Sequence, residues 1–332
     1  MEGLTPEQVK KFYNDGYLVI PDYLDQSTCV SLLQTINSLL REFPLETHPL
    51  TKFSTGESSA HVGDEYFLTS GDKVRFFFEE RAFSASSNLL EDPEAASTLV
   101  KSKEKAINKI GHALHAHVPE LGAISHEGIF GKLNARIASQ LGFRDPRLLQ
   151  SMVICKQPEI GGAVPAHQDS TFLYTMRPSA VGFWIALEDA TTENGCLSFA
   201  KGSHRTTPIR QRFIRTGSGT GFEDIQGSYS EDKQDAWWPR NFQHACLSFR
   251  SKQELSKTIG DQQHDYQLEP VKAGTMVLIH GNTLHKSEKN LSPHGRMIYT
   301  FHVIEGEEEF DNKNWLQIAG GPGAFTRLVE RG

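Results

Sequence analysis

The spacing of apolar residues changes near residue 149, and this change restricts the folds open to the chain. From Cys29 to Leu40 and from Ile129 to Leu141, apolar side chains recur at intervals of three and four, which predicts two amphipathic helices. Beyond residue 149, short apolar runs are separated by Gly, Pro and Asn, as is typical of strands; they cover 151–155, 182–187, 196–200, 275–280 and 297–304. Because no helical segments alternate with these runs, we expect a mainly antiparallel sandwich or jelly roll with a helical N-terminal layer.

Capping and turn residues mark several boundaries. The segment Thr5-Pro6-Glu7-Gln8 combines an N-cap, a proline at the first helical position and a capping-box glutamine, and Gly16 is placed to end that helix. A strand is then expected over Tyr17–Ile20. The pair Asn194-Gly195 lies between two strand-like runs and predicts a hairpin, because both residues tolerate the positive φ of a tight turn.

A further helix is expected over Ala106–His117, with its apolar residues on one face and Lys109 on another. This stretch contains His112, His115 and His117, which resemble a metal cluster. Residues at i, i+3 and i+5 do not share one helix face, so we expect structural roles for them. His204 and His280 are expected to lie in the core or beside a site.

Charge and length narrow the classes of protein that fit. The chain has 34 basic and 41 acidic side chains and a net charge of -7, which disfavours nucleic acid or an anionic membrane as its main partner. Its 332 residues suit either two domains or one large β domain with a helical layer. No apolar run approaches the roughly 18 residues of a membrane span. The sequence leaves the oligomeric state open.

The termini and the cysteines bear on the compartment. The first residues lack a signal-peptide pattern and Glu330-Arg331-Gly332 is not the peroxisomal tripeptide, so we expect a cytoplasmic protein. The cysteines are widely spaced and are expected to be buried reduced thiols: Cys29, Cys155, Cys196 and Cys246. Any metal must therefore be bound by His and carboxylate groups.

His167 and Asp169 are separated by one residue, so on a strand both side chains face the same way and can bind one ion. With 14 His and 41 acidic residues, about two such pairs arise by chance, and this pair alone is a weak signal. A third ligand must come from a distant strand, where His280 and His285 are both candidates. Two His and one Asp leave positions open at the metal, as in non-haem iron(II) oxygenases. Arg296 begins a later strand-like run and could bind the far end of a dicarboxylate.

Eight motifs then occur in order along the chain. They are Lys-x-Gly-His-Ala-Leu-His (109–115), Gln-Ser-Met (150–152), Lys-Gln-Pro-x-x-Gly-Gly (156–162), His-Gln-Asp (167–169), Trp-Ile-Ala-Leu-Glu-Asp-Ala (184–190), Glu-Asn-Gly-Cys-Leu (193–197), Gly-Ser-His (202–204) and His-Lys-Ser (285–287). With them the chain resembles the phytanoyl-CoA dioxygenase family, and within it the phytanoyl-CoA dioxygenase domain-containing proteins. The resemblance extends from Leu4 to Trp315.

The resemblance implies a double-stranded β-helix, a cupin-like jelly roll, in one domain over 1–332. Its parts would be a helix-rich 1–148 and a jelly-roll core 149–318 with an insertion at 217–268. It also implies a metal site of His167, Asp169 and His285, which selects His285 over His280. Contacts to 2-oxoglutarate are implied for the two residues of the His-x-Asp pair and for Lys109, Met152, Gln168, Trp184, Ser287 and Arg296. The catalytic set is thus His167, Asp169, His285 and Arg296.

The implied activity is that of an Fe(II)- and 2-oxoglutarate-dependent dioxygenase. Such an enzyme couples decarboxylation of 2-oxoglutarate by O2, to succinate and CO2, to hydroxylation of an aliphatic C–H bond. We expect a small-molecule substrate, an acyl-CoA or another carboxylic-acid derivative, with ascorbate as a candidate reductant. Asp169 disfavours a halogenating relative, whose site gives up that carboxylate, and Arg296 disfavours a metal hydrolase. A non-catalytic sensor or scaffold that binds iron and 2-oxoglutarate remains the alternative.

Two features bear on substrate choice. A basic cluster is a candidate site for the phosphates of a CoA-like substrate, or else a solvated loop: Lys201, Arg205, Arg210, Arg212 and Arg215. The insertion Gly217–Leu268 is expected to cover the iron, and its first part, to Asp235, has few large apolar residues and is expected to be mobile. Trp237, Trp238 and Phe242 would either face the barrel mouth or pack the insertion against the outside of the barrel.

Overall fold

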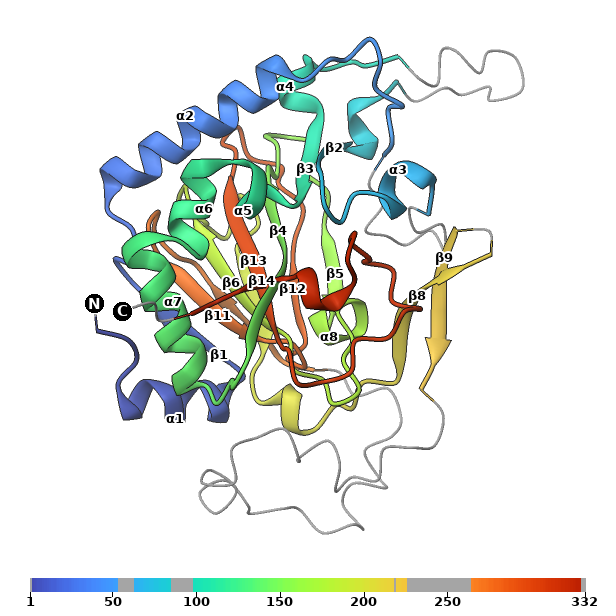
Figure 1. Cartoon of the computed structure of the whole chain (residues 1–332). Coiled ribbons are helices and arrows are strands. Elements are labelled where there is room, and N and C mark those ends of the chain that lie inside the picture. Colours follow the sequence, from blue (N-terminus) through green and yellow to red (C-terminus); the bar gives the residue numbers. More distant parts are fainter. Residues whose placement is uncertain (1, 53–62, 85–97, 218, 226–263, 330–332) are drawn as a thin grey trace.

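The computed structural model describes residues 2–52, 63–84, 98–217, 219–225 and 264–329, and two antiparallel sheets form its centre (Figure 1). The larger sheet runs in the order β1, β11, β6, β13, β4, β3, β2, with β14 beside β4. Its strands are β1 (Tyr17–Ile20), β2 (Val74–Phe78), β3 (Ile107–His112), β4 (Pro146–Ile154), β6 (Val181–Ala186), β11 (Met276–His280), β13 (Ile298–Glu305) and β14 (Thr326–Arg327). The smaller sheet consists of β10 (Tyr266–Glu269), β7 (Leu197–Ala200), β12 (His285–Ser287) and β5 (Val164–His167).

The inner faces of the two sheets pack against each other. Alternate residues of the larger sheet, among them Val277 and Ile298, form one buried cluster with Leu197 and Phe199 of the smaller sheet. The ring of Tyr17 stacks on that of Phe199, with ring centroids 4.0 Å apart, and so joins an edge strand of one sheet to the other. This arrangement of antiparallel strands confirms the predicted jelly roll.

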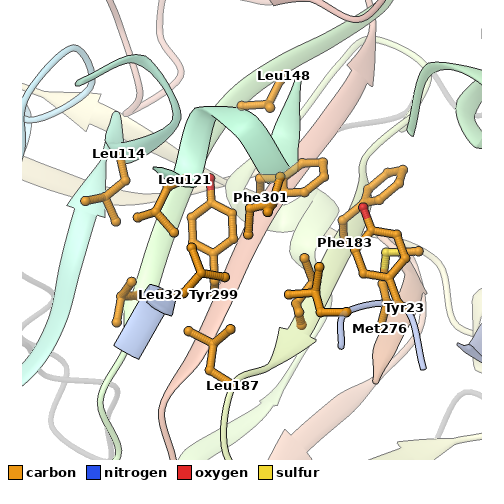
Figure 2. Close-up of a cluster of buried hydrophobic side chains, with 14 of the residues drawn as sticks. Tyr23, Leu32, Leu114, Leu121, Leu148, Phe183, Leu187, Met276, Tyr299 and Phe301 are labelled. Carbon is orange, nitrogen blue, oxygen red and sulfur yellow. The ribbon is translucent and has the colours of Figure 1, made fainter. Parts of the chain in front are cut away.

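Helices cover the outer face of the larger sheet. Tyr299 and Phe301 of β13 belong to a second buried cluster, separate from the one between the sheets, together with the helical residues Leu32, Leu114 and Leu121 (Figure 2). The helices are α1 (Pro6–Asp15), α2 (Gln26–Glu42), α3 (Glu65–Leu68), α4 (Lys103–Ala106), α5 (Leu114–His117), α6 (Pro119–Ser125), α7 (Gly128–Gln140) and α8 (Asp169–Phe172). The helices predicted around Cys29–Leu40 and Ile129–Leu141 are α2 and α7. The predicted helical layer is therefore confirmed.

The N-terminal segment folds as predicted. The Thr5 hydroxyl accepts a hydrogen bond from the Gln8 backbone N–H at 3.2 Å, and the Gln8 side-chain oxygen accepts one from the Thr5 N–H at 2.8 Å. Gly16 ends the helix with φ of 84°, in the left-handed region that glycine adopts without strain. β1 follows at once and pairs with β11.

The helix predicted over Ala106–His117 is wrong. Half of this stretch is β3, which pairs with both β2 and β4, and only its two ends are helical, Ala106 in α4 and Leu114–His117 in α5. Ile107 and Ile110 have helical spacing, but a central strand buried on both faces also accepts apolar residues at any position, so the spacing does not discriminate. Lys109 consequently lies on a strand and is buried.

The hairpin predicted at Asn194-Gly195 is also wrong, because the two flanking runs belong to different sheets. β6 pairs with β11 and β13, whereas β7 pairs with β10 and β12. Gly195 has φ of 82°, but Asn194 is not among the positive-φ residues that a two-residue hairpin turn requires. Asn194 instead accepts a hydrogen bond from the Thr191 N–H and donates one to the Asp189 carbonyl, which stabilises a crossover between sheets.

The described parts of the insertion differ from expectation. Residues 219–224 form β9 (Gly219–Asp224), which pairs with β8 (Gln211–Thr216), so this portion of the predicted mobile segment is a regular strand. Its pairing with β8 supplies the order that its sparse apolar residues did not suggest. Residues 226–263, with Trp237, Trp238 and Phe242, lie outside the described residues.

Two observations concern the class of protein. No helix within the described ranges is both long and apolar enough to cross a membrane. Cys29, Cys155 and Cys196 are buried and unbridged, in agreement with the expected reduced thiols, and Cys246 lies outside the described residues.

Candidate functional site

Three side chains from separate elements meet between the sheets. His167 ends β5, Asp169 begins α8 and His285 begins β12, and their ligand atoms all lie within 4.8 Å of one another. His167 and His285 are cross-strand partners in the smaller sheet, which brings together residues more than a hundred positions apart. Within the described residues, this is the group of His, Cys, Asp and Glu that has metal-binding spacing.

Asp169 is not on the strand where the pattern placed it. Gln168 has extended dihedral angles, φ of -120° and ψ of 125°, and α8 begins at the next residue. Because one extended residue separates them, His167 and Asp169 still face the same side, as residues i and i+2 of a strand do. The shared face was therefore predicted correctly, although the chain leaves the strand between the two ligands.

Hydrogen bonds leave one nitrogen of each histidine available to a metal. Nδ1 of His167 lies 2.9 Å from the Pro165 carbonyl oxygen, and Nδ1 of His285 lies 3.0 Å from that of Thr283. A carbonyl only accepts, so each Nδ1 carries the proton and each Nε2 presents a lone pair. These Nε2 atoms lie 3.5 and 3.8 Å from Oδ1 of Asp169. Histidines oriented in this way are characteristic of metal sites, so the three residues fit a divalent ion.

The charges of the site also suit a metal. Burial raises the pKa of Asp169, but the imidazoles of His285 and His302 outweigh it and hold that pKa well below its usual range. Burial and the neighbouring His167 lower the pKa of His285 to about 4. Burial acts downward on the pKa of His167 as well, yet its contact with Asp169 raises it overall. An ionised carboxylate and a neutral His285 are the forms that coordinate a cation.

The sequence pattern missed His302, which holds the metal-facing carboxylate. Nε2 of His302 lies 3.4 Å from Oδ2 of Asp169, and its Nδ1 lies 3.4 Å from Nε2 of Gln150. Gly182 makes this approach possible, since a Cβ there would lie 3.3 Å from the imidazole and 3.5 Å from the carboxylate. The only sequence signal for His302 was its alternation with the outward residues Tyr299 and Phe301 along β13.

Strand register collects other predicted residues around the three ligands. Met152, Thr300 and Trp184 occupy one row across β4, β13 and β6, two residues along from the row that contains His302. Because Tyr299 and Phe301 face the helices, this row faces the smaller sheet. Met152 and Trp184 thus lie on the inner face where contacts to 2-oxoglutarate were predicted, and that contact remains a prediction.

Lys109 lies in the same layer. It pairs in register with Ile154 on β4, and its ammonium lies 5.5 and 5.2 Å from the ring centroids of Phe67 and Phe77. Burial lowers the pKa of Lys109 well below its usual value. The expected helix over 106–117 would have placed Lys109 away from its apolar face, whereas the strand places it in the interior.

Arg296 is fully enclosed. It is 2% exposed, its Nη1 donates to the Gly195 carbonyl at 2.7 Å, and its guanidinium lies 5.5 Å from the Trp184 ring centroid. Its Nε has no hydrogen-bond partner in the described parts of the chain, and burial lowers the pKa of Arg296 to about 10. A buried guanidinium with an unused donor fits an anionic ligand, because such donors are otherwise costly. The remaining predicted contact, Ser287, accepts a hydrogen bond from the Lys156 ammonium at 2.7 Å.

Some predicted site residues have other partners. The side-chain amide of Gln168 donates to the carbonyls of Thr207 and Asn282, so it fixes two loops, and its predicted ligand contact stays untested. His280 does not join the three ligands. Its ring lies in the core, stacked 6.0 Å from Phe12, in agreement with the preference for His285.

The three histidines of the 106–117 stretch stay apart from the metal group in the structure. The imidazoles of His112, His115 and His117 form hydrogen bonds with the Ser70 hydroxyl, the Ser151 hydroxyl and the Asp72 carbonyl, respectively. These contacts fit the structural roles that we expected.

Four of the five residues in the predicted basic cluster have protein partners among the described residues. Lys201 pairs with Asp15, and Arg205 donates to the Asn14 carbonyl. Arg212 bonds Glu223 and Asp311, while Arg215 donates to two backbone carbonyls. Arg210, the fifth residue of the cluster, is exposed. The partners of the other four reduce the charge that is free for a phosphate, and the phosphate site stays a prediction.

Comparisons with known proteins agree with this geometry. Residues 12–298 match the model of the family described as phytanoyl-CoA dioxygenase (PhyH). The chain is 40% identical over 322 residues to phytanoyl-CoA dioxygenase domain-containing protein 1 of Rattus norvegicus, covering 96% of both chains. It is 35% identical over 321 residues to the phytanoyl-CoA dioxygenase of Arabidopsis thaliana, again covering 96% of each.

Solved structures share the fold at low sequence identity. The carbocyclase SnoK from nogalamycin biosynthesis, described as non-heme and alpha-ketoglutarate dependent, aligns with a TM-score of 0.52 at 19% identity, covering 93% of this chain and 87% of that one. EctD from S. alaskensis, crystallised with 2-oxoglutarate and 5-hydroxyectoine, aligns with a TM-score of 0.52 at 17% identity, covering 99% and 84%.

Proposed function

Because the chain belongs to the phytanoyl-CoA dioxygenase family, we propose that it hydroxylates an aliphatic C–H bond of a small molecule that carries a carboxylic-acid group or its derivative. The family and the fold make it an iron(II)- and 2-oxoglutarate-dependent oxygenase with a candidate His-Asp-His site. Ascorbate is proposed as the reductant that keeps the iron in its ferrous form.

The observation that carries the proposal is the convergence of His167, Asp169 and His285 with both Nε2 atoms and one carboxylate oxygen turned inward. Three protein ligands on one side of an ion leave positions for a bidentate co-substrate and for O2. Arg296 offers an unused donor in the same interior, which suits a co-substrate with a second carboxylate.

The chain's own residues would orient and protect the reacting groups. His302 would hold Asp169 so that Oδ1 faces the ion, and Arg296 would align 2-oxoglutarate through its distal carboxylate. When bound, iron with 2-oxoglutarate and O2 supplies the oxidising power for C–H cleavage. The buried inner rows of the larger sheet would exclude water from this chemistry.

Among carboxylic-acid substrates, the described residues favour one without CoA phosphates. Four residues of the basic cluster, all except Arg210, already have protein partners, so they offer little free charge to a nucleotide. Free acids and short esters are therefore the first compounds to test, with acyl-CoAs as the comparison set.

The test is succinate formation from 2-oxoglutarate by the Fe(II)-loaded protein with ascorbate, first alone and then with free acids and acyl-CoAs. We expect turnover in the wild type, loss in His167→Ala, and wild-type turnover in His117→Ala, a matched exposed histidine. Stimulation by one compound, with a product heavier by one oxygen atom, identifies the substrate class. Binding of metal and 2-oxoglutarate without succinate across all compounds would favour the non-catalytic sensor, and absence of any binding would refute the proposal.

A further inference from the structure

Two buried cations face each other beyond the ends of β4 and β13. In this antiparallel ladder Ile298 pairs with Ile154, so two residues further along Arg296 lies opposite Lys156. The Arg296 N–H donates to the Lys156 carbonyl at 3.3 Å, which confirms the pairing. Both residues are 2% exposed. Their side chains continue the inward-facing rows of the two strands.

Neither cation forms an ion pair with a carboxylate of the described residues. Within the part of the chain that the structure describes, the Lys156 ammonium makes one side-chain hydrogen bond, to the Ser287 hydroxyl, and the Arg296 guanidinium makes one, to the Gly195 carbonyl. Like charges directly opposite each other in a sheet are destabilising, and buried charges are usually paired. Burial first and Arg296 second lower the pKa of Lys156 to about 7, which is the expected response of an unpaired buried ammonium. An anion placed between the two would remove both costs.

Gly195 shapes the space around the two cations. A Cβ at this residue would lie 2.6 Å from Cε of Lys156, and φ of 82° already favours glycine. The bare backbone therefore approaches the lysine stem while its carbonyl binds Arg296. Gly195 of the Asn194-Gly195 motif, which does not form a hairpin, therefore contacts both cations.

We propose that Lys156 binds the distal carboxylate of 2-oxoglutarate together with Arg296, with the Ser287 hydroxyl fixing its ammonium. The inference rests on the proposed function, since it names a further residue for the same co-substrate. A lysine and an arginine on one carboxylate combine a point charge with a planar fork, so the pair selects a dicarboxylic 2-oxo acid over a monocarboxylic one.

Protonation of Lys156 should make the affinity for 2-oxoglutarate depend on pH. Lys156 is faced by Arg296, by the carboxylates of Glu79 and Glu288, and by the Cys196 thiol. A bound carboxylate would raise the pKa of Lys156 above its free value of about 7, so binding takes up a proton. Affinity for 2-oxoglutarate should then fall as pH rises from 7 to 8.5. In Lys156→Arg, which stays protonated in this range, the fall should disappear.

The test uses the full-length Mn(II)-loaded protein and calorimetric titration with 2-oxoglutarate. Lys156→Met should weaken 2-oxoglutarate binding by about 10- to 100-fold, the loss expected for one hydrogen bond to a charged group, and should leave Mn(II) affinity unchanged. 2-Oxopentanoate, which has the same chain length without the distal carboxylate, should bind wild type and variant equally. Lys286→Met, at a neighbouring half-buried lysine whose ammonium pairs with Glu288, should match the wild type.

A second measurement separates ligand binding from a packing role. Because the variant removes a buried like-charge contact, its ligand-free melting temperature should equal or exceed that of the wild type, whereas a structural lysine would lower it. Lys156→Gln, which can still bond Ser287, provides the same test should the methionine variant not fold. Wild-type 2-oxoglutarate affinity in these variants, or an equal loss for 2-oxopentanoate, would overturn the inference alone. A wild-type protein that does not bind 2-oxoglutarate would overturn the proposed function as well.

Discussion

Replacing His302 by phenylalanine tests whether metal affinity depends on the support of Asp169. The substitution keeps a ring of similar size on β13 and removes the Nε2–H that faces Oδ2 of Asp169 at 3.4 Å. Residues that orient a metal ligand typically contribute 10- to 100-fold to affinity. A contact of 3.4 Å is longer than a usual charge-assisted hydrogen bond, so we expect the lower end, about 10-fold or roughly 1.4 kcal/mol.

The same change also affects the free energy of unfolding. Nε2 of Gln150 would lose its contact with His302, and Oε1 of Gln150 already has no hydrogen-bond partner among the described residues. A buried amide left without a partner costs about 1–3 kcal/mol, so the melting temperature should fall. Pairing His302→Phe with Gln150→Leu should restore part of this stability, because both polar groups are then absent, but should not restore metal affinity.

The assay is anaerobic calorimetric titration of Fe(II), with a folded-state check by circular dichroism before each run. His117→Ala is the control for loss of a histidine elsewhere, since His117 is exposed on α5 and its side chain hydrogen-bonds the Asp72 carbonyl. Wild-type iron affinity in a folded His302→Phe protein would refute the role assigned to this contact. A loss of affinity that the double variant reverses would show that packing, and not Asp169 orientation, is responsible.

Other predictions follow from the same geometry. Arg296→Lys should weaken 2-oxoglutarate binding far more than iron binding, because a point charge replaces a planar fork. Calorimetry with each ligand checks this, and a 2-oxoglutarate affinity equal to that of the wild type would contradict it. His285→Ala should abolish iron binding, whereas a folded His280→Ala should retain it, and the reverse result would exchange their assignments. Iron affinity should fall as pH drops from 7.5 to 6, because the pKa of His167 is raised and the metal must displace its proton; a flat profile would count against this. Thr5→Ala should lower the free energy of unfolding by about 1 kcal/mol, measured by urea denaturation, and an unchanged midpoint would show that the cap contributes nothing.

The errors in secondary structure share one cause. Over 106–117 and at Asn194-Gly195, local patterns fitted two conformations equally well, and the choice depended on pairing with distant strands. β3 is a strand because β2 and β4 lie on either side of it, and the Asn194-Gly195 turn crosses between sheets because β6 and β7 find partners elsewhere. By contrast, the cap at Thr5 was predictable because all of its hydrogen bonds close within four residues.

What the sequence determined by itself was chemistry that depends on residue type and short spacing. The His-x-Asp pair and the order of motifs indicated the family, and the resemblance to that family selected His285 as the third ligand. Only the tertiary structure decided which side chains support those ligands. Lys156 lies opposite Arg296 through the register of β4 with β13, and His302 of β13 faces inward to meet Asp169 of α8; both contacts join residues more than a hundred positions apart. Register is set by the packing of whole sheets, and a shift of β13 by one residue would turn His302 and Arg296 to the opposite face, so no local pattern could specify these contacts.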